Sequence, residues 1–543
     1  MLLPHGHGSV NLICKTGTVP TNPEVVSPSS GAPGGSRVVI LPPTDAERSI
    51  YQRRHLLVLG TMVTLAFAGI TYGFVRLALS VSWAEVFLVY WCFAMLSFLV
   101  SLSANYFTRD FDEAAHTRFI SAYEFESYPS VDVWLPNCGE SLDILRNTWT
   151  HVQQLEWPGP INVYCLDDRG LSEVEAMADE FGFHYLSRPD KGWMKKSGNL
   201  KFAYEHTAGE LILLFDADFS PRDDMLLELV PYFLEEERLG ILQTSQYFRV
   251  EKGQNWVERG SAEAQEYFYR SCQWSRQQRG AAICCGTNAL YRRAALDANE
   301  GMTLIPQGED MRTGFDLQQL GWRLLYLPLN LAVGLCPDNI SSFFKQQYRW
   351  CMGSLRLLSE ERFWQADLSA AARLCYVAGF NYYIQTALYT FMVPALMISL
   401  LIFEPDRFQV RNYVVFLPAL LVLLVVYPLW HRCRYGPEAW SIRIICEWCY
   451  IFAIVDFLRD AVIPWDATGS QSFSVAGTSR FQQFQWLALC WNGLSAAAWT
   501  GLAIWRLATR DWVSFIVITA MGLFYVSNSY RLLSSFLNPE LVA

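Results

Sequence analysis

The chain has 543 residues, of which 52% are hydrophobic and only 17% are charged, and its formal net charge is −10. Soluble globular proteins carry roughly 25% charged residues, so this composition excludes a disordered scaffold, a small disulfide-stapled module and a coiled coil. The acidic balance also argues against a nucleic-acid-binding protein, whose surface is normally basic. A membrane protein with one sizeable soluble part is the class that this arithmetic favours.

Residues 1–55 are rich in Gly, Pro, Ser, Thr and Val and offer little to bury, so we expect a disordered N-terminal tail. Two apolar runs follow within residues 56–107, and each is longer than the ~20 residues that cross a hydrocarbon core. Four further candidate spans come much later, at 374–402, 412–430, 484–505 and 512–533. The sequence therefore predicts about six transmembrane helices, two before and four after a long soluble insert.

Residues 108–360 form the predicted soluble insert, in which short apolar runs alternate with helical patterns. The runs at 131–135, 161–166 and 211–215 each end in polar or acidic residues, and a helix is expected over Ser172–Phe181. This pattern is typical of buried parallel strands joined by crossover helices, and ligands bind at the carboxyl ends of such strands. We therefore predict an α/β domain with a Rossmann-like mixed sheet and a ligand site at those ends.

The remaining chain divides into an interfacial segment with two spans at 361–435, an interfacial helix and loop at 436–482, and two spans with a short C-terminus at 483–543. The apolar content of the stretch 440–464 suggests a transmembrane helix, yet the stretch carries five charged residues. Each charge at a bilayer centre costs roughly 2.5–3.5 kcal/mol on insertion scales. We therefore expect an amphipathic helix in the cytoplasmic interface.

Basic residues flank the spans unevenly. Arg48, Arg53 and Arg54 precede the first span, and its short loop to the second span contains no Lys or Arg. The positive-inside rule then predicts a multi-pass plasma-membrane protein with its N-terminus and soluble domain in the cytoplasm. Four arginines in the predicted outer loops argue against this orientation, namely Arg407, Arg411, Arg506 and Arg510.

Two acidic motifs follow predicted strands, Asp167-Asp168 and Asp216-Ala217-Asp218. Carboxylate oxygens in an Asp-x-Asp motif are hard ligands that can hold a divalent cation against a diphosphate. Four of the seven lysines in the chain lie between these motifs, at 191–201. This concentration of scarce lysines favours a site for a phosphate-bearing donor over a solvated charged face.

Two more motifs lie further along the chain. Gly308-Glu309-Asp310 precedes a helical stretch and offers a carboxylate that can act as a general base or simply begin a helix. Gln346-Gln347-Tyr348-Arg349-Trp350 combines an arginine that can pair with phosphate and an indole that can stack on a sugar ring. An interfacial helix with aromatic residues at the membrane surface also accounts for this pattern, and it does not exclude that role.

The order of these motifs, with spans before and after, resembles the processive family-2 glycosyltransferases, and most of all cellulose synthase and the cellulose synthase-like β-glucan synthases. The resemblance covers about residues 129–480 and includes Gln243–Phe248, Cys285-Gly286-Thr287 and Gly321-Trp322-Arg323. It implies a cytosolic GT-A catalytic domain inserted in the transmembrane helices.

The resemblance also implies roles for individual residues. Asp310 would be the base that deprotonates the acceptor hydroxyl. The donor site would consist of Asp167, Asp168, Lys196, Asp216, Gln346 and Arg349, with Asp218 as a ligand of Mg²⁺ or Mn²⁺. The acceptor sugar would contact Trp350, Cys285 and Gly286.

Two motifs depart from the family pattern. The family has Thr-Glu-Asp where this chain has Gly308-Glu309-Asp310, so the carboxylate is kept but the contact before it is lost. Phe473-Ser474-Val475 stands where the family has a gating loop, but the Thr and Lys that follow in the family are replaced. Arg480 would supply the missing cation by a shift of two residues.

A single base and one attack on the anomeric carbon imply inversion, so an α-linked donor gives a β-linked polymer. We expect UDP-glucose as the donor and a β-glucan, such as cellulose or a β-1,3- or mixed-linkage glucan, that leaves through the protein's own membrane channel. Mannan, chitin and hyaluronan stay open as products, as does non-processive transfer to a lipid carrier. A secondary transporter is disfavoured because the spans show no evident repeat symmetry. The sequence does not specify an oligomeric state or accessory subunits.

Overall fold

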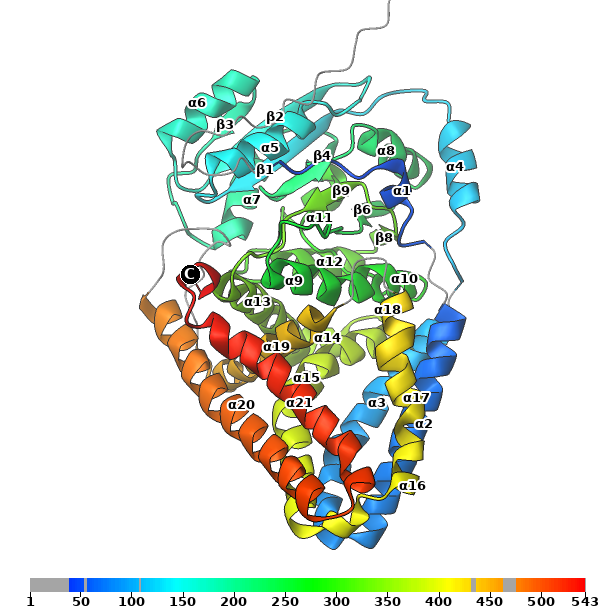
Figure 1. Cartoon of the computed structure of the whole chain (residues 1–543). Helices are drawn as coiled ribbons and strands as arrows, with labels where there is room; N and C mark the ends of the chain where they lie inside the picture. The colour runs from blue at the N-terminus through cyan, green and yellow to red at the C-terminus, as the bar shows by residue number, and fades with distance from the viewer. Residues whose placement is uncertain (1–38, 53–55, 107–108, 431–435, 462–474, 543) are drawn as a thin grey trace, which may run out of the picture. The chain divides into compact units, whose positions relative to one another are not determined.

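A seven-stranded sheet with the order β3-β2-β1-β4-β7-β6-β8 forms the centre of the soluble domain, and a two-stranded sheet joins β5 to β9 (Figure 1). The computed structural model describes residues 39–52, 56–106, 109–430, 436–461 and 475–542. The strands are β1 (Val131–Asn137), β2 (Ile161–Asp167), β3 (His184–Leu186), β4 (Leu211–Leu214), β5 (Phe219–Pro221), β6 (Leu239–Thr244), β7 (Ala289–Arg292), β8 (Arg323–Leu327) and β9 (Ala332–Gly334).

The large sheet is mixed. Strands β3, β2, β1 and β4 run parallel, and β7 enters antiparallel between β4 and β6, while β6 runs parallel to β8. Every residue of β1 is buried because Val133 packs into one hydrophobic core and Trp134 into another. The three apolar runs of the sequence correspond to β1, β2 and β4, and the expected helix is α6 (Ser172–Phe181). The predicted α/β domain with a mixed sheet is confirmed.

The helices of the soluble domain begin at side-chain caps in several cases, such as Ser141, Asn255 and Asn339, whose side chains accept backbone N–H groups of the first turn. In chain order these helices are α4 (Glu113–Ser121), α5 (Leu142–Val152), α6, α7 (Lys195–His206), α8 (Met225–Glu235), α9 (Trp256–Tyr267), α10 (Gln273–Gln277), α11 (Arg293–Ala298), α12 (Glu309–Gln319), α13 (Ile340–Ser359) and α14 (Glu361–Gln365).

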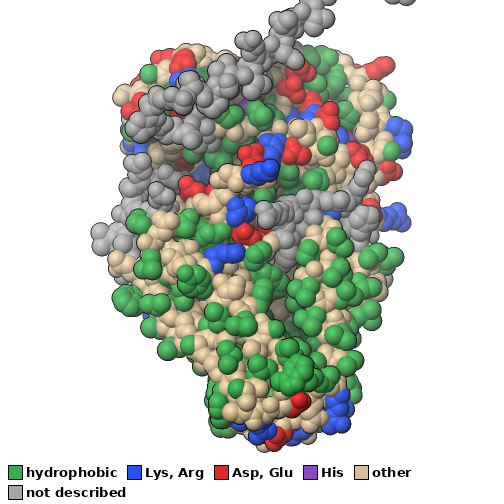
Figure 2. All heavy atoms as spheres, viewed as in Figure 1, with side chains coloured by type: hydrophobic (Ala, Val, Ile, Leu, Met, Phe, Trp, Pro, Cys, Tyr) green, Lys and Arg blue, Asp and Glu red, His purple; other side chains and the backbone are tan. Residues whose placement is uncertain are grey.

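Within the described residues, six helical segments are long and apolar enough to cross a membrane, as the sequence predicts. They are Leu57–Ser80 in α2 (Leu56–Ser80), Ser82–Val100 leading into α3 (Val86–Tyr106), α15 (Ala370–Phe403), Val410–Trp430 across α16 (Val410–Tyr413), α17 (Leu417–Leu421) and α18 (Tyr427–Trp430), Arg480–Thr509 in α20 (Val475–Thr509), and α21 (Trp512–Ser535). On the face shown in Figure 2, hydrophobic side chains cover the region that these helices form, and charged side chains return at its lower end.

Helix α19 (Pro437–Leu458) is not one of the six segments. It packs against α9 and α13 of the soluble domain and also against α15 and α21. Its Arg443 lies 3.4 Å from Glu447 and 4.6 Å from the ring centroid of Tyr389. The location of this helix in the cytoplasmic interface stays a prediction.

The expected disordered tail over residues 1–55 is wrong for residues 39–52, which are folded against the soluble domain. Ile40 and Tyr51 are buried in the core that contains β1, and Asp45–Arg48 form the short helix α1. The physical reason is that partners far away in sequence order this segment, which its Pro-rich composition does not reveal. Residues 1–38 lie outside the described residues.

Candidate active site

Lys196 connects two of the motifs at the end of the parallel strands. From the first turn of α7, its Nζ atom donates to the carboxylate of Asp216, which follows β4, and to the carbonyl oxygen of Gly286 at 2.8 Å. Burial disfavours its charged form, but Asp216 and Glu309 outweigh burial and hold the pKa of Lys196 above its ordinary value. The protein therefore keeps a permanent positive charge at this edge of the sheet.

Asp310 lies against Gly286 at the first turn of α12. Gly286 has a φ of 76°, and a Cβ atom added to it would be 2.8 Å from Oδ2 of Asp310, so the approach requires glycine. Burial and the neighbouring charge of Glu309 raise the pKa of Asp310 to about 7, against a hydrogen bond from the backbone N–H of Met311 that lowers it. A carboxyl group with this pKa can take up a proton near neutral pH.

Arg349 of α13 belongs to the same electrostatic cluster. Burial lowers its pKa below the ordinary value, whereas the carboxylates of Glu309 and Asp216 favour its charged form. On the same helix, Oε1 of Gln346 is buried and has no hydrogen-bond partner among the described residues. Trp350 exposes 37% of its surface. The helix thus brings a cation to the cluster, and the same helix carries an unsatisfied amide oxygen and an accessible indole.

Asp167, the last residue of β2, is fully buried and held by the protein itself. Its carboxylate accepts hydrogen bonds from the backbone N–H groups of Arg169 (2.9 Å) and Leu171 (2.6 Å) and from the hydroxyl of Tyr185 (3.0 Å). These bonds fix the loop between β2 and α6. Contact between Asp167 and a donor stays a prediction.

Asp168 forms a buried ion pair that the sequence did not indicate. Nε of Arg188 lies 2.5 Å from its carboxylate, and the backbone N–H of Gly192 donates to the same oxygen at 3.1 Å. Arg188 is 1% exposed and also donates to the carbonyl oxygens of Trp193 (2.5 Å) and Lys195 (3.2 Å). Nothing in the sequence distinguishes an arginine two residues after β3 from a solvated one.

The contacts of Arg188 with Asp168 and with the backbone hold a strained part of the chain. Met194 and Lys195 have φ angles of 49° and 54°, the left-handed region that non-glycine residues rarely adopt. Lys196 is the next residue, and its side chain contacts Asp216. Arg188 therefore acts on the site by fixing the backbone from which Lys196 extends.

The predicted metal ligand, Asp218, lies beside a second carboxylate. Burial and the charge of Asp216 raise the pKa of Asp218 to about 7, and Glu140 adds to the same effect. No group of three or more His, Cys, Asp or Glu side chains with the spacing of a metal site occurs among the described residues. Two acidic side chains with hard oxygen ligands nevertheless fit a divalent cation whose remaining ligands come from a diphosphate and water.

Cys285 and Gly286, the predicted acceptor residues, lie in a segment held by glutamine side chains. The backbone N–H of Cys285 donates to Oε1 of Gln243 at 2.7 Å, and its carbonyl oxygen accepts from Nε2 of Gln246 at 3.2 Å. Burial raises the pKa of the Cys285 thiol well above its ordinary value, so the thiol stays protonated. The backbone of this segment, rather than thiolate chemistry, is what it contributes.

Of the predicted gating residues, Phe473 lies outside the described residues and Val475 is the first residue of α20. Arg480 of the same helix forms an ion pair with Asp456 of α19. The other carboxylate oxygen of Asp456 accepts a hydrogen bond from Tyr348, inside the Gln346–Trp350 motif, at 3.2 Å. The gating role of Arg480 stays a prediction, but its side chain is connected to that motif through one carboxylate.

Comparison with known proteins agrees with this arrangement. Residues 211–431 match the family model described as glycosyl transferase family group 2. Cellulose synthase 1 of Komagataeibacter xylinus is 31% identical over 258 residues, which is 47% of this chain and 17% of that protein. The UDP-forming cellulose synthase catalytic subunit of Xanthomonas axonopodis pv. citri (strain 306) is 30% identical over 255 residues, 46% of this chain and 35% of that protein.

Among solved structures, a mannosyltransferase from Pyrobaculum calidifontis in complex with GDP-Man and Mn²⁺ aligns with a TM-score of 0.48 at 14% identity, over 68% of this chain and 98% of that one. The matched part spans about a third or less of the two cellulose synthases. The family-model match at 211–431 includes the sequence from β4 to α18, and therefore Asp216, Asp310 and the Gln346–Trp350 motif. Residues 211–431 are thus similar to glycosyl transferase family group 2, and about half of the chain is similar in sequence to cellulose synthases.

Proposed function

We propose that the protein is a processive, inverting glycosyltransferase that polymerises a nucleotide sugar into a β-linked polysaccharide and passes the product across the membrane. The observation that carries the proposal is the convergence of Lys196, Asp216, Gly286 and Asp310 at one edge of the sheet, with Arg349 in the same electrostatic cluster. A permanent cation and a carboxyl group that titrates near pH 7 are the two groups that this transfer requires.

The cations act on the donor. The diphosphate leaving group develops negative charge as the sugar–phosphate bond breaks, and Lys196 and Arg349 stabilise that charge. The free Oε1 atom of Gln346 orients the donor by accepting a hydrogen bond from it. Asp216 holds Lys196 in place before the donor binds, so the lysine needs no rearrangement during the reaction.

Asp310 acts on the acceptor. Its carboxylate removes the proton of the acceptor hydroxyl while the hydroxyl oxygen attacks the anomeric carbon. The bond from that carbon to the diphosphate breaks on the opposite side, and the nucleoside diphosphate leaves with the electron pair. One displacement inverts the anomeric configuration, so an α-linked donor yields a β-linkage. The exposed indole of Trp350 offers a stacking face for the acceptor sugar.

A divalent cation, Mg²⁺ or Mn²⁺, fits beside Asp216 and Asp218. Two neighbouring carboxylates repel each other, and a bound cation relieves that repulsion. The raised pKa of Asp218 reflects burial and repulsion by Asp216. When bound, the cation supplies further neutralisation of the diphosphate. Asp218 would be the main protein ligand of the cation.

UDP-glucose and a β-glucan such as cellulose are the donor and product that we propose. The support is the sequence similarity to cellulose synthases, of which the Xanthomonas protein is named as UDP-forming. The six membrane-crossing segments provide a path for the polymer, with the catalytic domain on the cytoplasmic side of the plasma membrane.

The test uses the full-length protein in detergent or liposomes with Mg²⁺ or Mn²⁺. Radiolabelled UDP-glucose, UDP-N-acetylglucosamine, UDP-glucuronate and GDP-mannose are supplied separately, and insoluble product is digested with linkage-specific hydrolases. We expect a β-glucan from UDP-glucose, no product with Asp310→Asn, and normal product with the surface variant Glu180→Gln. Absence of polymer with every donor, or synthesis by Asp310→Asn, contradicts the proposal. Transfer of one sugar to a lipid supports the non-processive alternative.

A further inference from the structure

Residues 40–52, which we call the N-terminal strap, precede the first membrane span and lie across the catalytic domain. Ile40 exchanges two hydrogen bonds with the side chain of Asn147, at 2.9 and 3.2 Å, and is buried. At the other end Tyr51 is 3% exposed and packs edge-on against Tyr247, with ring centroids 5.8 Å apart. Between them, Thr44 and Glu47 form a capping box that fixes helix α1.

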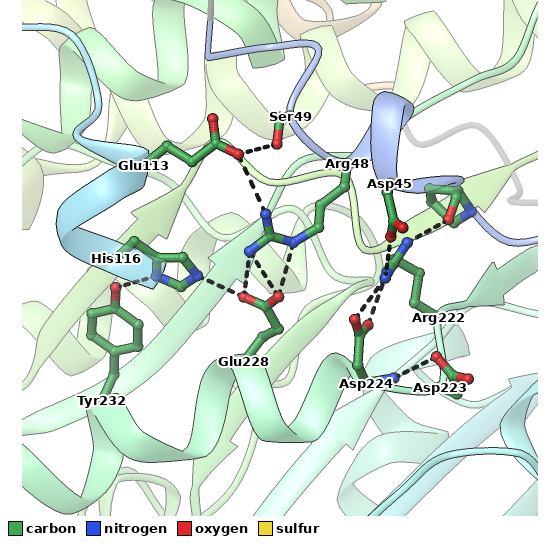
Figure 3. A network of polar contacts seen from close by, with 11 residues as sticks. Asp45, Arg48, Ser49, Glu113, His116, Arg222, Asp223, Asp224, Glu228 and Tyr232 are labelled. Atoms are coloured by element: carbon green, nitrogen blue, oxygen red, sulfur yellow. Dashed lines mark hydrogen bonds and ion pairs between the residues drawn. The ribbon is translucent and has the colours of Figure 1, made fainter. Parts of the chain in front are cut away.

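Arg48 anchors the strap to helix α8 (Figure 3). Its guanidinium donates two hydrogen bonds of 2.8 Å to the carboxylate of Glu228, and Nε2 of His116 lies 2.6 Å from the same carboxylate. His116 is 3% exposed, and its Nδ1 atom lies 2.6 Å from the hydroxyl of Tyr232. A bidentate pair enclosed in this way resists exchange with water far better than a surface ion pair.

A second ion pair connects the strap to Arg249. The guanidinium of Arg249 contacts both carboxylate oxygens of Glu47 at 2.7 Å, and the hydroxyl of Tyr247 donates to Glu47 at 3.2 Å. Burial opposes the charge of Glu47, but Arg249 and the backbone N–H of Thr44 lower its pKa to about 2. Glu47 is therefore ionised at every physiological pH and holds the backbone around Arg249.

The strap also contacts Asn330, a fully buried residue. The side-chain amide of Asn330 donates to the carbonyl oxygen of Glu47 at 2.9 Å, and its backbone N–H donates to that of Arg48 at 3.0 Å. The side-chain oxygen of Asn330 contacts the hydroxyl of Ser245. The next residue, Gln246, donates to the carbonyl oxygen of Cys285 at the predicted acceptor site.

The segment 245–250 needs such support because it lies between β6 and α9 and has little strand pairing of its own. Its regular backbone contacts are an isolated bridge between Tyr247 and Val333 and hydrogen bonds at Ser245 and Tyr247. Loops held by few backbone hydrogen bonds open locally at low free-energy cost. Side chains of the strap thus supply contacts that a sheet would supply elsewhere.

We infer that the N-terminal strap positions the acceptor side of the active site. Through Glu47–Arg249 and through Asn330–Ser245, it fixes the segment that carries Gln246, and Gln246 fixes the backbone of Cys285 beside Gly286 and Asp310. Glu47, Arg249 and Asn330 are positioning residues that touch no reacting atom. The inference rests on the proposed function because it assigns the acceptor to that edge of the site.

The first test compares polymer synthesis by full-length Glu47→Gln, Arg249→Gln and Asn330→Ala with the wild type. We expect kcat to fall about tenfold and the polymer to become shorter, because misplacement of the acceptor by a fraction of an ångström lowers the rate steeply. The KM for the nucleotide sugar should stay within about twofold of the wild type, since the donor groups do not contact the strap.

The charge-swapped variant Glu47→Arg/Arg249→Glu should recover part of the lost kcat. Arg146→Gln is the matched control, because it breaks another bidentate Arg–Glu pair, at the surface of α5 and α6. It should leave kcat and polymer length unchanged. Wild-type kcat and polymer length in Glu47→Gln and Asn330→Ala overturn the inference, as does a parallel loss of donor affinity.

Hydrogen exchange measured by mass spectrometry separates this inference from the proposed function. In Asn330→Ala, amides of 245–250 and 284–288 should exchange faster than in the wild type, while those of α6 should not change. If exchange is faster in Asn330→Ala but the wild type makes no polymer, the proposed function is contradicted while the contact between the strap and the segment 245–250 is supported. Unchanged exchange in both segments overturns the strap inference even if the wild type makes polymer.

Discussion

Asp310 shows how the surroundings of a single residue set the pH range of a reaction. Its pKa of about 7 reflects burial and the charge of Glu309. A general base acts only when ionised, so with Asp310 as the proposed base kcat/KM should rise with pH through about 7 and level off above it. Glu309→Gln removes a negative neighbour, lowers the pKa of Asp310, and should move this rising limb to lower pH. Initial rates of sugar transfer over a pH series measure the shift.

The surface variant Glu180→Gln serves as the control for that series, because Glu180 forms an exposed ion pair with Arg146 and is not one of the main charges that shift the pKa of Asp310. It should leave the rising limb where it is in the wild type. A rate that does not vary with pH around neutrality, or a limb that Glu309→Gln leaves in place, contradicts the role of Asp310 as base.

Arg188 illustrates a residue whose loss is expected to affect both stability and the site. In Arg188→Met the buried carboxylate of Asp168 loses its partner, which costs about 3–5 kcal/mol of stability for a buried pair. The double variant Arg188→Met/Asp168→Leu removes both charges and should recover much of the unfolding temperature. It should still bind nucleoside diphosphate weakly, because the carbonyl groups of Trp193 and Lys195 remain unbraced and because Asp168, a predicted donor contact, is also lost.

Thermal unfolding in detergent and calorimetric titration with UDP measure these two effects separately. Recovery of full nucleotide affinity in the double variant would show that neither Asp168 nor the contacts of Arg188 with the backbone contribute to donor binding. An unchanged unfolding temperature in Arg188→Met would show that the pair is not buried in solution.

At the scale of elements, two glycines set the distance between α12 and α13. Gly308, the N-cap of α12, has a φ of 74°, and a Cβ atom added to it would be 3.2 Å from Cα of Gly353 on α13. Helix α12 carries Asp310, and α13 carries Arg349. The Gly308 that departs from the family pattern therefore has a counterpart in Gly353, and the close approach brings the base and the cation together.

Gly308→Ala should therefore reduce activity as well as stability. Gly182 provides a matched control, because its φ is 70° but an added Cβ would meet nothing within 4 Å. Gly182→Ala should lose about 1–2 kcal/mol of stability from the left-handed backbone alone and keep its kcat. Gly308→Ala should show a similar strain and also a lower kcat, measured with saturating donor. Equal kcat in the two variants contradicts the positioning role of the close approach.

The elements differ in how far the sequence alone could predict them. Strands β1 and β4 were predictable because strands buried on both faces are largely apolar runs. Strand β2 is a similar run although its first four residues are only partly buried, and α6 was predictable because its apolar positions repeat with helical spacing. The antiparallel entry of β7 between β4 and β6 was not, since pairing between distant strands depends on tertiary packing. The site motifs were found, but their internal partners were not. Arg188 and the strap depend on contacts distant in sequence.

For the whole molecule, the contacts between membrane loops bear on orientation. Arg407 donates to the carbonyl oxygen of Ser80 at 3.0 Å and lies 3.4 Å from Glu404, while Arg510 pairs with Asp406. The loops that follow the first, third and fifth candidate spans therefore meet at one end of the helices. Two of the arginines that argued against the predicted orientation, Arg407 and Arg510, are paired with carboxylates of these loops.

We predict that these loops face outward and the catalytic domain faces the cytoplasm. A cysteine introduced at Ser82, which is exposed at the start of the second span, should react with a membrane-impermeant maleimide in intact cells. A cysteine at Lys252, exposed on the catalytic domain, should react only after permeabilisation. Labelling of the wild type gives the background from its own cysteines. The reverse pattern of labelling would mean that the domain lies outside.

The N-terminal strap also has a consequence in time. Asn330 follows its partner Glu47 by 283 residues, so at roughly 5–20 residues per second the ribosome needs about 15–60 s to supply the docking surface after the strap has emerged. The first two spans are made during that interval, and the docking surface of the strap is incomplete until Asn330 has been added. Full docking of the strap therefore follows synthesis of the catalytic sequence up to Asn330 and can precede the last four spans.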